Sequence, residues 1–447
     1  MTGALVAGDR VVVLGLGVAG KAVTRALRKR NIDVTAIEDR PTEEAHSFAN
    51  EVGAALLISP TGDDLVDAFT GADGFIPSPG VPDTHEAFAV ADTLTIQTLS
   101  EFDLARWWDD RPIAAITGTD GKTSVTMLTV DMLVASGVAT AAVGNTDVPL
   151  VEAIDDPSYD AFVVEASSFR LGHSQRFSPL AAAWLNFSPD HLDVHSTLEL
   201  YERAKAEIWQ SLPPGGLAVA PVDDAIVQRH LPADQKAILV GLTSEGAANA
   251  YVEAGRLIVD GTDIGSIDLL PRRFDHDITN TLVAAALALH LGANVDGIGT
   301  AIERHELAPH RIQHIATVDG VDYYNDSKAT VPHAVVTAVR SFDSVVLIAG
   351  GKNKGLDLSE LGELSNLTRA VIAMGDAGDD VAAAFDGLAP VHRANDMDDA
   401  IKTASEIATA GDTVLLSPGC ASFDAYANYA ARGDDFIRAV TELAGVT

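Results

Sequence analysis

Short apolar runs alternate with amphipathic stretches along the 447-residue chain. The run RVVVL at 10–14 is rich in β-branched residues, and after a glycine turn the stretch at 21–30 repeats its apolar residues at helical spacing. A second apolar run at 33–39 ends in two acids. Strands that alternate with helices favour a parallel sheet covered by helices, so we predict an α/β domain at this end of the chain.

The strand, loop and helix pattern recurs twice more. The segment SEFDLARWWDDRP at 100–112 predicts a helix that ends in a proline-marked linker, and a new apolar run starts directly after it. A third section opens at 307–335 and contains further apolar runs, each followed by a loop and a helical stretch. We therefore predict an α/β protein of three domains, namely a Rossmann-like domain at 1–98, a P-loop-type ATPase domain at 99–307 and a second Rossmann-like domain at 308–447.

Composition and charge exclude several classes of partner. The 64 acidic and 30 basic residues give a formal net charge of −34, which repels nucleic acid and anionic membranes. Cys420 is the single cysteine, so the chain can form no internal disulfide and no cysteine-based zinc site. No apolar run reaches the roughly 20 residues of a membrane-spanning helix, and no secretory leader pattern is present. We expect a cytoplasmic protein, and we take adaptation to a salty cytoplasm as a hypothesis for the acidic surplus.

A glycine-rich loop follows the apolar run at 114–117 and precedes a helical stretch. It has two residues rather than four between its glycines, so it is a shortened P-loop. Loop N–H groups and the helix N-terminus can receive phosphate oxygens, Lys122 supplies a positive charge, and the Thr123 hydroxyl can hold Mg²⁺. A turn with a helix cap is the alternative, but strand, glycines, Lys-Thr and helix all coincide. We predict that the loop binds a nucleoside triphosphate.

Acidic and basic side chains follow the next apolar runs. Glu165 ends a strand pattern, where its carboxylate can bind a metal or orient water, and Lys205 lies on a later helical stretch. Oxygen ligands of this kind suit Mg²⁺ much better than zinc. The intervening segment NFSPDHLDVH contains Asp190, His191, Asp193 and His195, of which we expect Asp193 and His195 to be solvated loop charges.

The first apolar run leads into a second glycine motif, Gly15-Leu16-Gly17-Val18-Ala19-Gly20, with Glu38 and Asp39 about 20 residues further on. In isolation this pattern indicates NAD. Close packing of a helix on a strand is the alternative explanation. A loop at Ser78-Pro79-Gly80 also follows an apolar run and could present backbone N–H groups.

Nine segments occur in the order and approximate spacing seen in the Mur ligases: ITGTDGKTS, GNTDVPL, VVEASSFRL, NFSPDHLDVH, YERAKAEIW, PHRIQ, YYNDSKAT, GGKNKG and LLSPGCASFDAYANYAARGDDF. The chain resembles this family over nearly its whole length, and NDSKAT and SPGCASFD most resemble its D-glutamate-adding members. The resemblance implies an enzyme that uses ATP and two Mg²⁺ ions to join D-glutamate to UDP-N-acetylmuramoyl-L-alanine, a peptidoglycan precursor. A carboxylate is a poor electrophile, and in this family it is activated as an acyl phosphate.

The resemblance also implies roles for individual residues. It assigns ATP to Gly118, Thr119, Asp120, Gly121, Lys122, Thr123, Ser124, Asn280, Arg311, Asp326 and Lys328. It assigns the UDP substrate, in place of NAD, to Gly15, Leu16, Gly17, Asp39, Ser78, Gly80, Asn145 and His191. It assigns D-glutamate to Thr330, Lys354, Ser422, Phe423 and Tyr429, with Lys352 as an alternative to Lys354. It assigns catalysis to Lys122, Glu165, His191 and Lys205, and the metal to Thr123, Glu165, His191 and a carbamylated Lys205. It further implies a monomer.

Four positions depart from the family pattern, and three of them, Asp120, Asp147 and Asp277, add negative charge near anionic ligands; the fourth is Val331. Three alternatives stay open. A related ligase would use a different amino acid or acceptor. A noncatalytic nucleotide-gated binding protein would be expected to lack catalytic residues such as Lys122 or Glu165, and a plain NTPase or kinase would not require Lys354 and Ser422.

Overall fold

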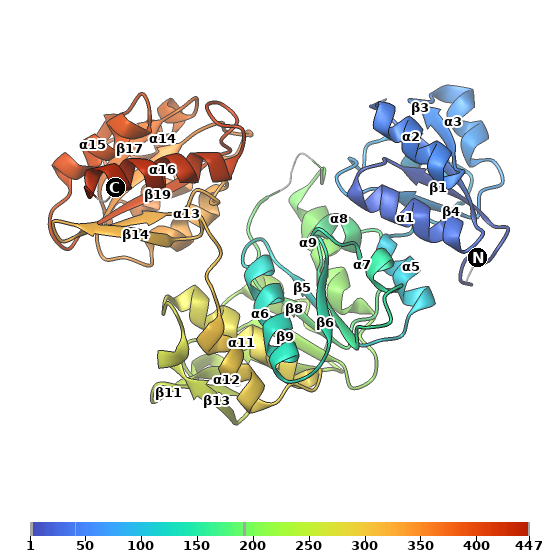
Figure 1. Cartoon of the computed structure of the whole chain (residues 1–447), viewed down its shortest axis with the longest axis horizontal. Helices are drawn as coiled ribbons and strands as arrows, with labels where there is room; N and C mark the ends of the chain where they lie inside the picture. The colour runs from blue at the N-terminus through green and yellow to red at the C-terminus, as the bar shows by residue number, and fades with distance from the viewer. Residues whose placement is uncertain (1–2, 41, 191–193, 446–447) are drawn as a thin grey trace. The chain divides into compact units, whose positions relative to one another are not determined.

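The first sheet is fully parallel, with strand order β3-β2-β1-β4 (Figure 1). The structure, a computed structural model, describes residues 3–40, 42–190 and 194–445. Val11 and Val13 of β1 pack towards α1, whereas Val12 and Leu14 pack towards α3 and α4, as the alternation of side chains along a strand requires. The elements are β1 Arg10–Leu14, α1 Val18–Lys29, β2 Asp33–Glu38, α2 Glu43–Val52, β3 Ala55–Ile58, α3 Gly62–Phe69, β4 Gly74–Pro77 and α4 Glu86–Thr93.

The second sheet has nine strands in the order β13-β12-β11-β10-β9-β8-β5-β7-β6. Its strands are β5 Ile113–Thr117, β6 Thr140–Gly144, β7 Ala161–Glu165, β8 Ala181–Trp184, β9 Leu217–Pro221, β10 Lys236–Val240, β11 Ala250–Glu253, β12 Arg256–Val259 and β13 Thr262–Ser266. The pairings from β6 to β11 are parallel, and β11, β12 and β13 pair antiparallel. The sequence pattern does not predict this antiparallel extension, whose strands are short.

Helices cover both faces of the second sheet. One buried cluster joins α6, α11 and α12 to Ala114 and Ile116, and another joins α5 and α9 to Ile113 and Ala115. Ser100 and Asp103 form a capping box that starts α5, in agreement with the helix predicted there. The helices are α5 Glu101–Trp108, α6 Lys122–Ala135, α7 Leu150–Ala153, α8 Ser168–Leu171, α9 Leu198–Gln210, α10 Ala225–Gln228, α11 Asp275–His290 and α12 Val295–Arg304, with 3-10 turns η1 Glu245–Ala247 and η2 Ile267–Leu269.

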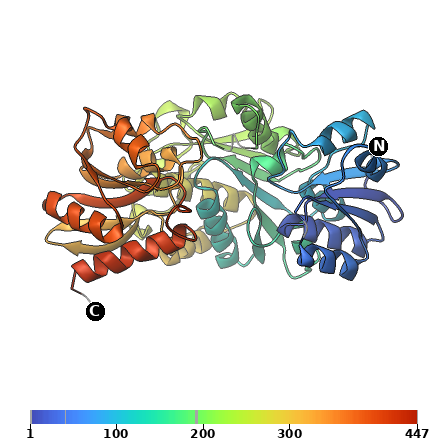
Figure 2. The same ribbon diagram turned by 90° about the horizontal axis from the view of Figure 1, so that it is seen from above.

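The third sheet has the order β14-β15-β19-β16-β17-β18, in which only the β14–β15 pairing is antiparallel. Buried clusters place α13 and α14 on one face and α15 and α16 on the other, and Figure 2 shows helices on both sides of these strands, coloured orange to red. The elements are β14 Gln313–Val318, β15 Val321–Asn325, α13 Pro332–Val339, β16 Val345–Gly350, η3 Ser359–Leu364, β17 Thr368–Met374, α14 Gly378–Ala384, β18 Val391–Arg393, α15 Met397–Ile407, β19 Thr413–Gly419 and α16 Tyr429–Leu443.

The three sheets belong to two compact units. The first unit is Met1–Arg273 with Asp277–His305 and contains the first two sheets; the second is Phe274–His276 with Glu306–Thr447 and contains the third. The predicted α/β class with three layered sheets is confirmed, while the domain limits at 98 and 307 stay predictions. A search of the described helices for one long and apolar enough to cross a membrane found none.

The acidic surplus leads to a prediction about salt. Arg438 illustrates how few cations there are, because it contacts three carboxylates, those of Asp398, Asp435 and Glu442. Raising KCl from about 0.1 M to about 2 M shortens the screening length from roughly 10 Å to under about 3 Å and so weakens repulsion among the remaining acids. We expect the melting temperature to rise over this range, measured by differential scanning fluorimetry. Sorbitol at equal osmolality is the control, and a flat or falling curve in KCl would reject the salt hypothesis.

Candidate active site

The shortened P-loop lies at the centre of the second sheet. It follows β5, which pairs in parallel with β7 on one side and β8 on the other, so that Ile116 lies opposite Glu165 and Thr117 opposite Trp184. The carboxyl ends of parallel strands meet at one edge of the sheet, which is where such folds bind ligands. The loop, Glu165 and the residues after Trp184 therefore gather at the same edge.

Glycine at position 121 is required by both backbone and space. Gly121 precedes α6 with a left-handed φ of 82°. An added Cβ would lie 3.1 Å from Asn280 Oδ1 and 3.2 Å from Leu185 Cδ1. Asn280 thus lies beside the loop, and because it is inside α11 rather than at its start, it is not a helix cap. This location is consistent with the predicted contact to a nucleotide.

Asn186 holds the loop in shape, a role that the sequence pattern does not predict. Its Oδ1 accepts hydrogen bonds from the backbone N–H groups of Thr119 and Asp120, both at 2.9 Å. Its Nδ2 donates to the Asp120 carbonyl at 3.2 Å. The signal that could have identified it is an asparagine two residues after the apolar strand β8, which pairs with β5, the strand before the loop.

Two further side chains hold the loop. Lys122 Nζ donates to the carbonyls of Gly118 and Thr119 at 2.9 and 2.8 Å, so the ammonium lies over the loop itself. Thr119 is buried, and its Oγ1 donates to the Ser188 carbonyl at 3.1 Å and lies 3.4 Å from the Tyr201 hydroxyl. The cation predicted to meet phosphate is thus in place at the loop.

Glu165 has one satisfied and one unsatisfied oxygen. Its side chain is buried, at 3% exposure, and Oε1 accepts from Asn145 Nδ2 at 2.9 Å. Oε2 is buried and has no hydrogen-bond partner among the described residues. A buried carboxylate oxygen without a partner is costly unless another group binds it, and a hard cation such as Mg²⁺ is well suited to do so.

Lys205 is buried in the same region, at 2% exposure. Its Nζ donates to the Gly118 carbonyl at 2.6 Å and lies 4.5 Å from the centre of the Tyr201 ring. Burial, reinforced by repulsion from Lys122, holds the pKa of the Lys205 amine well below its ordinary value. This burial excludes an ordinary solvated lysine at position 205.

The segment after Ser188 is described only in part. His191 and Asp193 lie outside the described residues, and among those that are described no three His, Cys, Asp or Glu side chains are close enough to hold a metal. The expectation that His195 is a solvated loop residue is wrong, since it is 9% exposed, with Nε2 2.9 Å from Ser168 Oγ and its ring stacked on Phe169. Stacking and burial outweigh the polarity of the surrounding sequence.

The charge at Asp277 is neutralised locally. Arg272 Nε and Nη2 donate to its two oxygens at 2.7 and 2.8 Å, and both side chains are largely buried. A bidentate pair of this kind removes much of the repulsion expected between Asp277 and an anionic ligand. Asp147, by contrast, is exposed at the end of the β6 loop.

The glycine motif of the first sheet closes tightly on itself. A Cβ added at Gly20 would lie 1.9 Å from the Gly15 carbonyl oxygen and 2.6 Å from Ser78 Oγ. Ser78 Oγ in turn donates to the Gly15 carbonyl at 2.8 Å. Gly20 therefore packs helix on strand, in agreement with the packing alternative, and this does not exclude a ligand at the exposed Gly17 and Gly80.

Glu38 and Asp39, the acids after β2, have different partners. Glu38 Oε2 accepts from the Leu16 N–H at 2.8 Å, and Oε1 accepts from the Arg40 N–H at 3.0 Å. Asp39 is exposed and pairs with His85 Nε2 at 3.1 Å. Of the two, Asp39 is the more exposed acid and is accessible to a ligand, whereas Glu38 stabilises the glycine loop through the Leu16 N–H group.

Gly20→Ala should lower the free energy of unfolding by about 1–3 kcal/mol, because the new methyl group must displace the Gly15 carbonyl. Gly17→Ala is the matched control, since nothing lies within 4 Å of a Cβ there. Urea denaturation, followed through the unfolding transition of the first unit, measures the free energy of unfolding of both variants. Equal stability of the two variants would contradict the packing role of Gly20.

The second unit contains the residues predicted to complete the ATP site. Asp326 is buried, with Oδ1 accepting from the Ile312 N–H at 3.2 Å and Oδ2 accepting from Ser417 Oγ at 2.8 Å. Lys328 Nζ lies 5.5 Å from the centre of the Tyr429 ring, and Arg311 is half-buried. Asp326 therefore ties the segment after β15 to β19, and its contact with ribose stays a prediction.

Four of the five residues predicted to bind D-glutamate lie on loops of the third sheet, and the fifth, Tyr429, begins α16. Thr330 is half-buried and Lys354 exposed, whereas Ser422 is buried and Phe423 is 62% exposed. Lys352 and Lys354 are both exposed, and Lys352 pairs by backbone hydrogen bonds with Ala421. The choice between these two lysines stays open.

Arg432 connects two of these loops, a role that the sequence pattern does not predict. Its buried guanidinium donates to Ser327 Oγ at 3.0 Å and to the Ser327 carbonyl at 2.9 Å. It also donates to the carbonyls of Cys420 and Ala421 at 3.1 and 3.3 Å. Burial lowers the pKa of Arg432 to about 10. The NDSKAT and SPGCAS segments are thus held together by one side chain.

Comparison with known protein families gives two matches along the chain. Residues 116–288 match the Mur ligase middle domain. Residues 310–420 match the Mur ligase, glutamate ligase domain. Together these ranges span more than half of the chain, and they contain the P-loop edge of the second sheet and most of the third.

Full-length relatives are similar throughout. The chain is 38% identical to a UDP-N-acetylmuramoylalanine–D-glutamate ligase of Frankia casuarinae over 98% of this chain and 95% of that protein. It is 36% identical to the ligase of the same name from Salinibacter ruber over 97% and 98%. Among solved structures, MurF from Acinetobacter baumannii superposes with a TM-score of 0.62 at 17% identity, covering 97% of this chain and 91% of that one. A pseudomurein peptide ligase type C from Methanothermus fervidus gives 0.60 at 16%, covering 98% and 100%.

Proposed function

Because the chain belongs to the Mur ligase family, we propose how its residues carry out the ATP-dependent addition of D-glutamate to UDP-N-acetylmuramoylalanine. This reaction, a step of peptidoglycan precursor synthesis, is the activity of its full-length relatives, and the chain is a ligase of this type. The observation that carries the proposal is the gathering of the P-loop, Glu165 and Lys205 at one edge of the second sheet.

The P-loop binds the phosphates of ATP. Loop N–H groups and the start of α6 face the anion, and Lys122 moves from the carbonyls of Gly118 and Thr119 to the phosphate oxygens. Asn186 keeps the loop in shape, because it already holds the Thr119 and Asp120 N–H groups. The terminal phosphoryl group is transferred to the substrate carboxylate, and the amine of D-glutamate attacks the resulting acyl phosphate.

Thr123 and Glu165 would hold Mg²⁺ through their oxygens, and His191, outside the described residues, would take part in a second site. The unsatisfied Oε2 of Glu165 fits this role. When bound, the metal would neutralise charge on the phosphates during transfer. Asn145 holds the other oxygen of Glu165 and thereby orients the carboxylate.

Lys205 becomes an oxygen donor by carbamylation. The lowered pKa of its amine favours the neutral form, and it is this form that attacks CO₂. The attack forms an N–C bond, releases one proton and leaves a carbamate anion. The anion provides oxygens of the type that Mg²⁺ prefers, whereas an ammonium group would repel the metal. Its position beside the Gly118 carbonyl supports a role at the P-loop.

The two other substrates use sites on different sheets. The UDP group lies at the loops of the first sheet, near Leu16, Asp39 and Gly80, and the reacting end of the sugar lies near the exposed Asn145. D-glutamate is bound by loops of the third sheet, where a lysine, Lys354 or Lys352, supplies a cation for a dicarboxylate. A cytoplasmic location and a monomeric state stay predictions.

Phosphate release tests the proposal. The purified chain with ATP, Mg²⁺ and UDP-N-acetylmuramoylalanine is assayed with D-glutamate, L-glutamate, L-lysine and meso-diaminopimelate in parallel, and the product is identified by mass spectrometry. We expect phosphate and a new amide only with D-glutamate. ADP formed without any amide would indicate a plain NTPase, and an amide with another amino acid would indicate a related ligase.

A further inference from the structure

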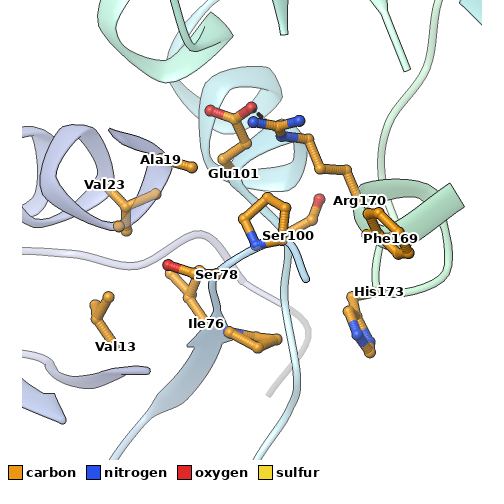
Figure 3. A pocket seen from close by; sticks show the side chains of 13 residues that line it. Val13, Ala19, Val23, Ile76, Ser78, Ser100, Glu101, Phe169, Arg170 and His173 are labelled. Carbon is orange, nitrogen blue, oxygen red and sulfur yellow. Dashed lines mark ion pairs between the residues drawn. The ribbon is translucent and has the colours of Figure 1, made fainter. Parts of the chain in front are cut away.

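A buried ion pair lies near residues predicted to bind the UDP substrate, namely Ser78 and Asn145. Arg170 of α8 places its Nε 2.7 Å from Glu101 Oε1 of α5, and the two side chains are only 8% and 3% exposed. Figure 3 shows the guanidinium and the carboxylate facing each other beside a cavity. Gly20 and Ser78 of the glycine-motif region line the same cavity, together with Phe169 of α8.

The ion pair is the start of a chain of polar contacts. Arg170 Nη1 donates to Asn145 Oδ1 at 3.1 Å, and Asn145 Nδ2 donates to Glu165 Oε1 at 2.9 Å. The two ends of an amide are not interchangeable here, because only the oxygen can accept from the guanidinium and only the nitrogen can donate to the carboxylate. Arg170 and Glu165 together determine which way the amide of Asn145, an exposed residue, points.

Stability alone is a weak reason for this arrangement. Removing two ions from water costs several kcal/mol for each, and a well-packed apolar pair of the same shape is often as stable. Burial raises the pKa of Glu101, and the nearby Arg170 guanidinium opposes that shift by favouring the charged carboxylate. A costly charged pair that ends on a substrate-facing amide suggests a role in positioning.

We propose that Arg170, held by Glu101, is a positioning residue for ligation, which fixes the amide of Asn145 so that its N–H group faces Glu165 and its exposed edge faces the substrate. The inference rests on the proposed function, because that function gives Glu165 and Asn145 their ligands. Without Arg170, the Asn145 oxygen loses its donor, and only the single contact with Glu165 still holds the amide. The loss of substrate affinity on removal of Arg170 should therefore depend on the presence of Asn145.

A mutational cycle separates positioning from structure. The variant Arg170→Met/Glu101→Gln replaces the ion pair by a neutral pair of similar shape and avoids an uncompensated buried charge. We expect it to melt near the unmodified protein, yet to bind UDP-N-acetylmuramoylalanine about 10- to 100-fold more weakly, the range for loss of one charge-assisted hydrogen bond. In an Asn145→Ala background the same change should weaken binding less than about threefold. Isothermal calorimetry with UDP-N-acetylmuramoylalanine measures all four dissociation constants.

Several outcomes are decisive. Binding unchanged by the neutral pair, or weakened equally in both backgrounds, would overturn the inference. If the neutral pair does not fold, Arg170→Lys is used instead, because it keeps the charge without the forked donors. It should give an intermediate loss of binding affinity, and this loss should again disappear in the Asn145→Ala background. A loss of affinity that is undiminished in that background overturns the inference. Arg176→Met, which removes an exposed arginine near the ring of Trp107, is the control and should bind normally. Full ligation activity in Glu165→Gln would instead refute the proposed metal site, whatever the cycle shows.

Discussion

Lys205→Ala should abolish ligation, lowering kcat by about 10³-fold or more, because it removes both the buried amine beside Gly118 and the carbamate that it forms. Added formate or acetate should restore part of the activity, since a small carboxylate can occupy the space of the missing side chain and supply an oxygen ligand. The measurement is phosphate release with all substrates present, as a function of the concentration of the added acid.

The rescue distinguishes chemistry from packing. A residue that only fills space would not be replaced in function by a soluble anion. Lys236→Ala is the matched control, because Lys236 is an exposed lysine that pairs with Asp260 at 2.7 Å, and it should keep full activity. Removal of CO₂ from the buffer should lower the activity of the unmodified protein, and its return should restore it. Full activity in Lys205→Ala would refute the carbamate.

Glu165→Gln should lower kcat by about 10²- to 10³-fold with a small change in melting temperature. Glutamine keeps the shape of the side chain and an oxygen that can accept from Asn145, but it replaces the unsatisfied Oε2 by an N–H donor that cannot bind a cation. The half-saturating concentration of Mg²⁺ in the phosphate-release assay should rise as well.

The magnesium dependence is the informative readout for this variant. A purely structural role of Glu165 would lower the melting temperature and leave the magnesium curve unchanged. Glu207→Gln on α9 is the control. Glu207 is also a glutamate that is not fully exposed, and it has no role in the proposed site. A magnesium curve that coincides with that of the unmodified protein would exclude Glu165 as a ligand.

Local pattern was sufficient for the elements that carry the site. The strand β5, the loop at Gly118 and the helix α6 were predicted because apolar runs, glycines and helical spacing are properties of neighbouring residues. Glu165 was identified in the same way, as an acid at the end of a strand. The antiparallel strands β11 to β13 were not predicted, because they are short and their pairing depends on contacts with β10.

Residues whose role depends on distant partners were missed or misjudged. His195 appeared solvated from its polar surroundings, yet Phe169 and Ser168 bury it. Asn186 and Arg432 are unremarkable in sequence and become organisers only where loops from separate strands meet them. The charge of Asp277 appeared unfavourable for an anionic ligand until its contact with Arg272 was known.

The sequence by itself determined the strands and helices that carry the site, the chemical groups at the strand ends and the resemblance to the Mur ligases, because each of these is encoded in short contiguous segments. Only the tertiary structure decided that Glu165 keeps one buried oxygen unsatisfied, that Lys205 is buried against the P-loop, and that Glu101 reaches Asn145 through Arg170. Burial and hydrogen bonding are set by residues far apart in sequence, 87 positions for Lys205 and Gly118 and 105 for Arg432 and Ser327. Parallel strands bring such residues to one edge of a sheet.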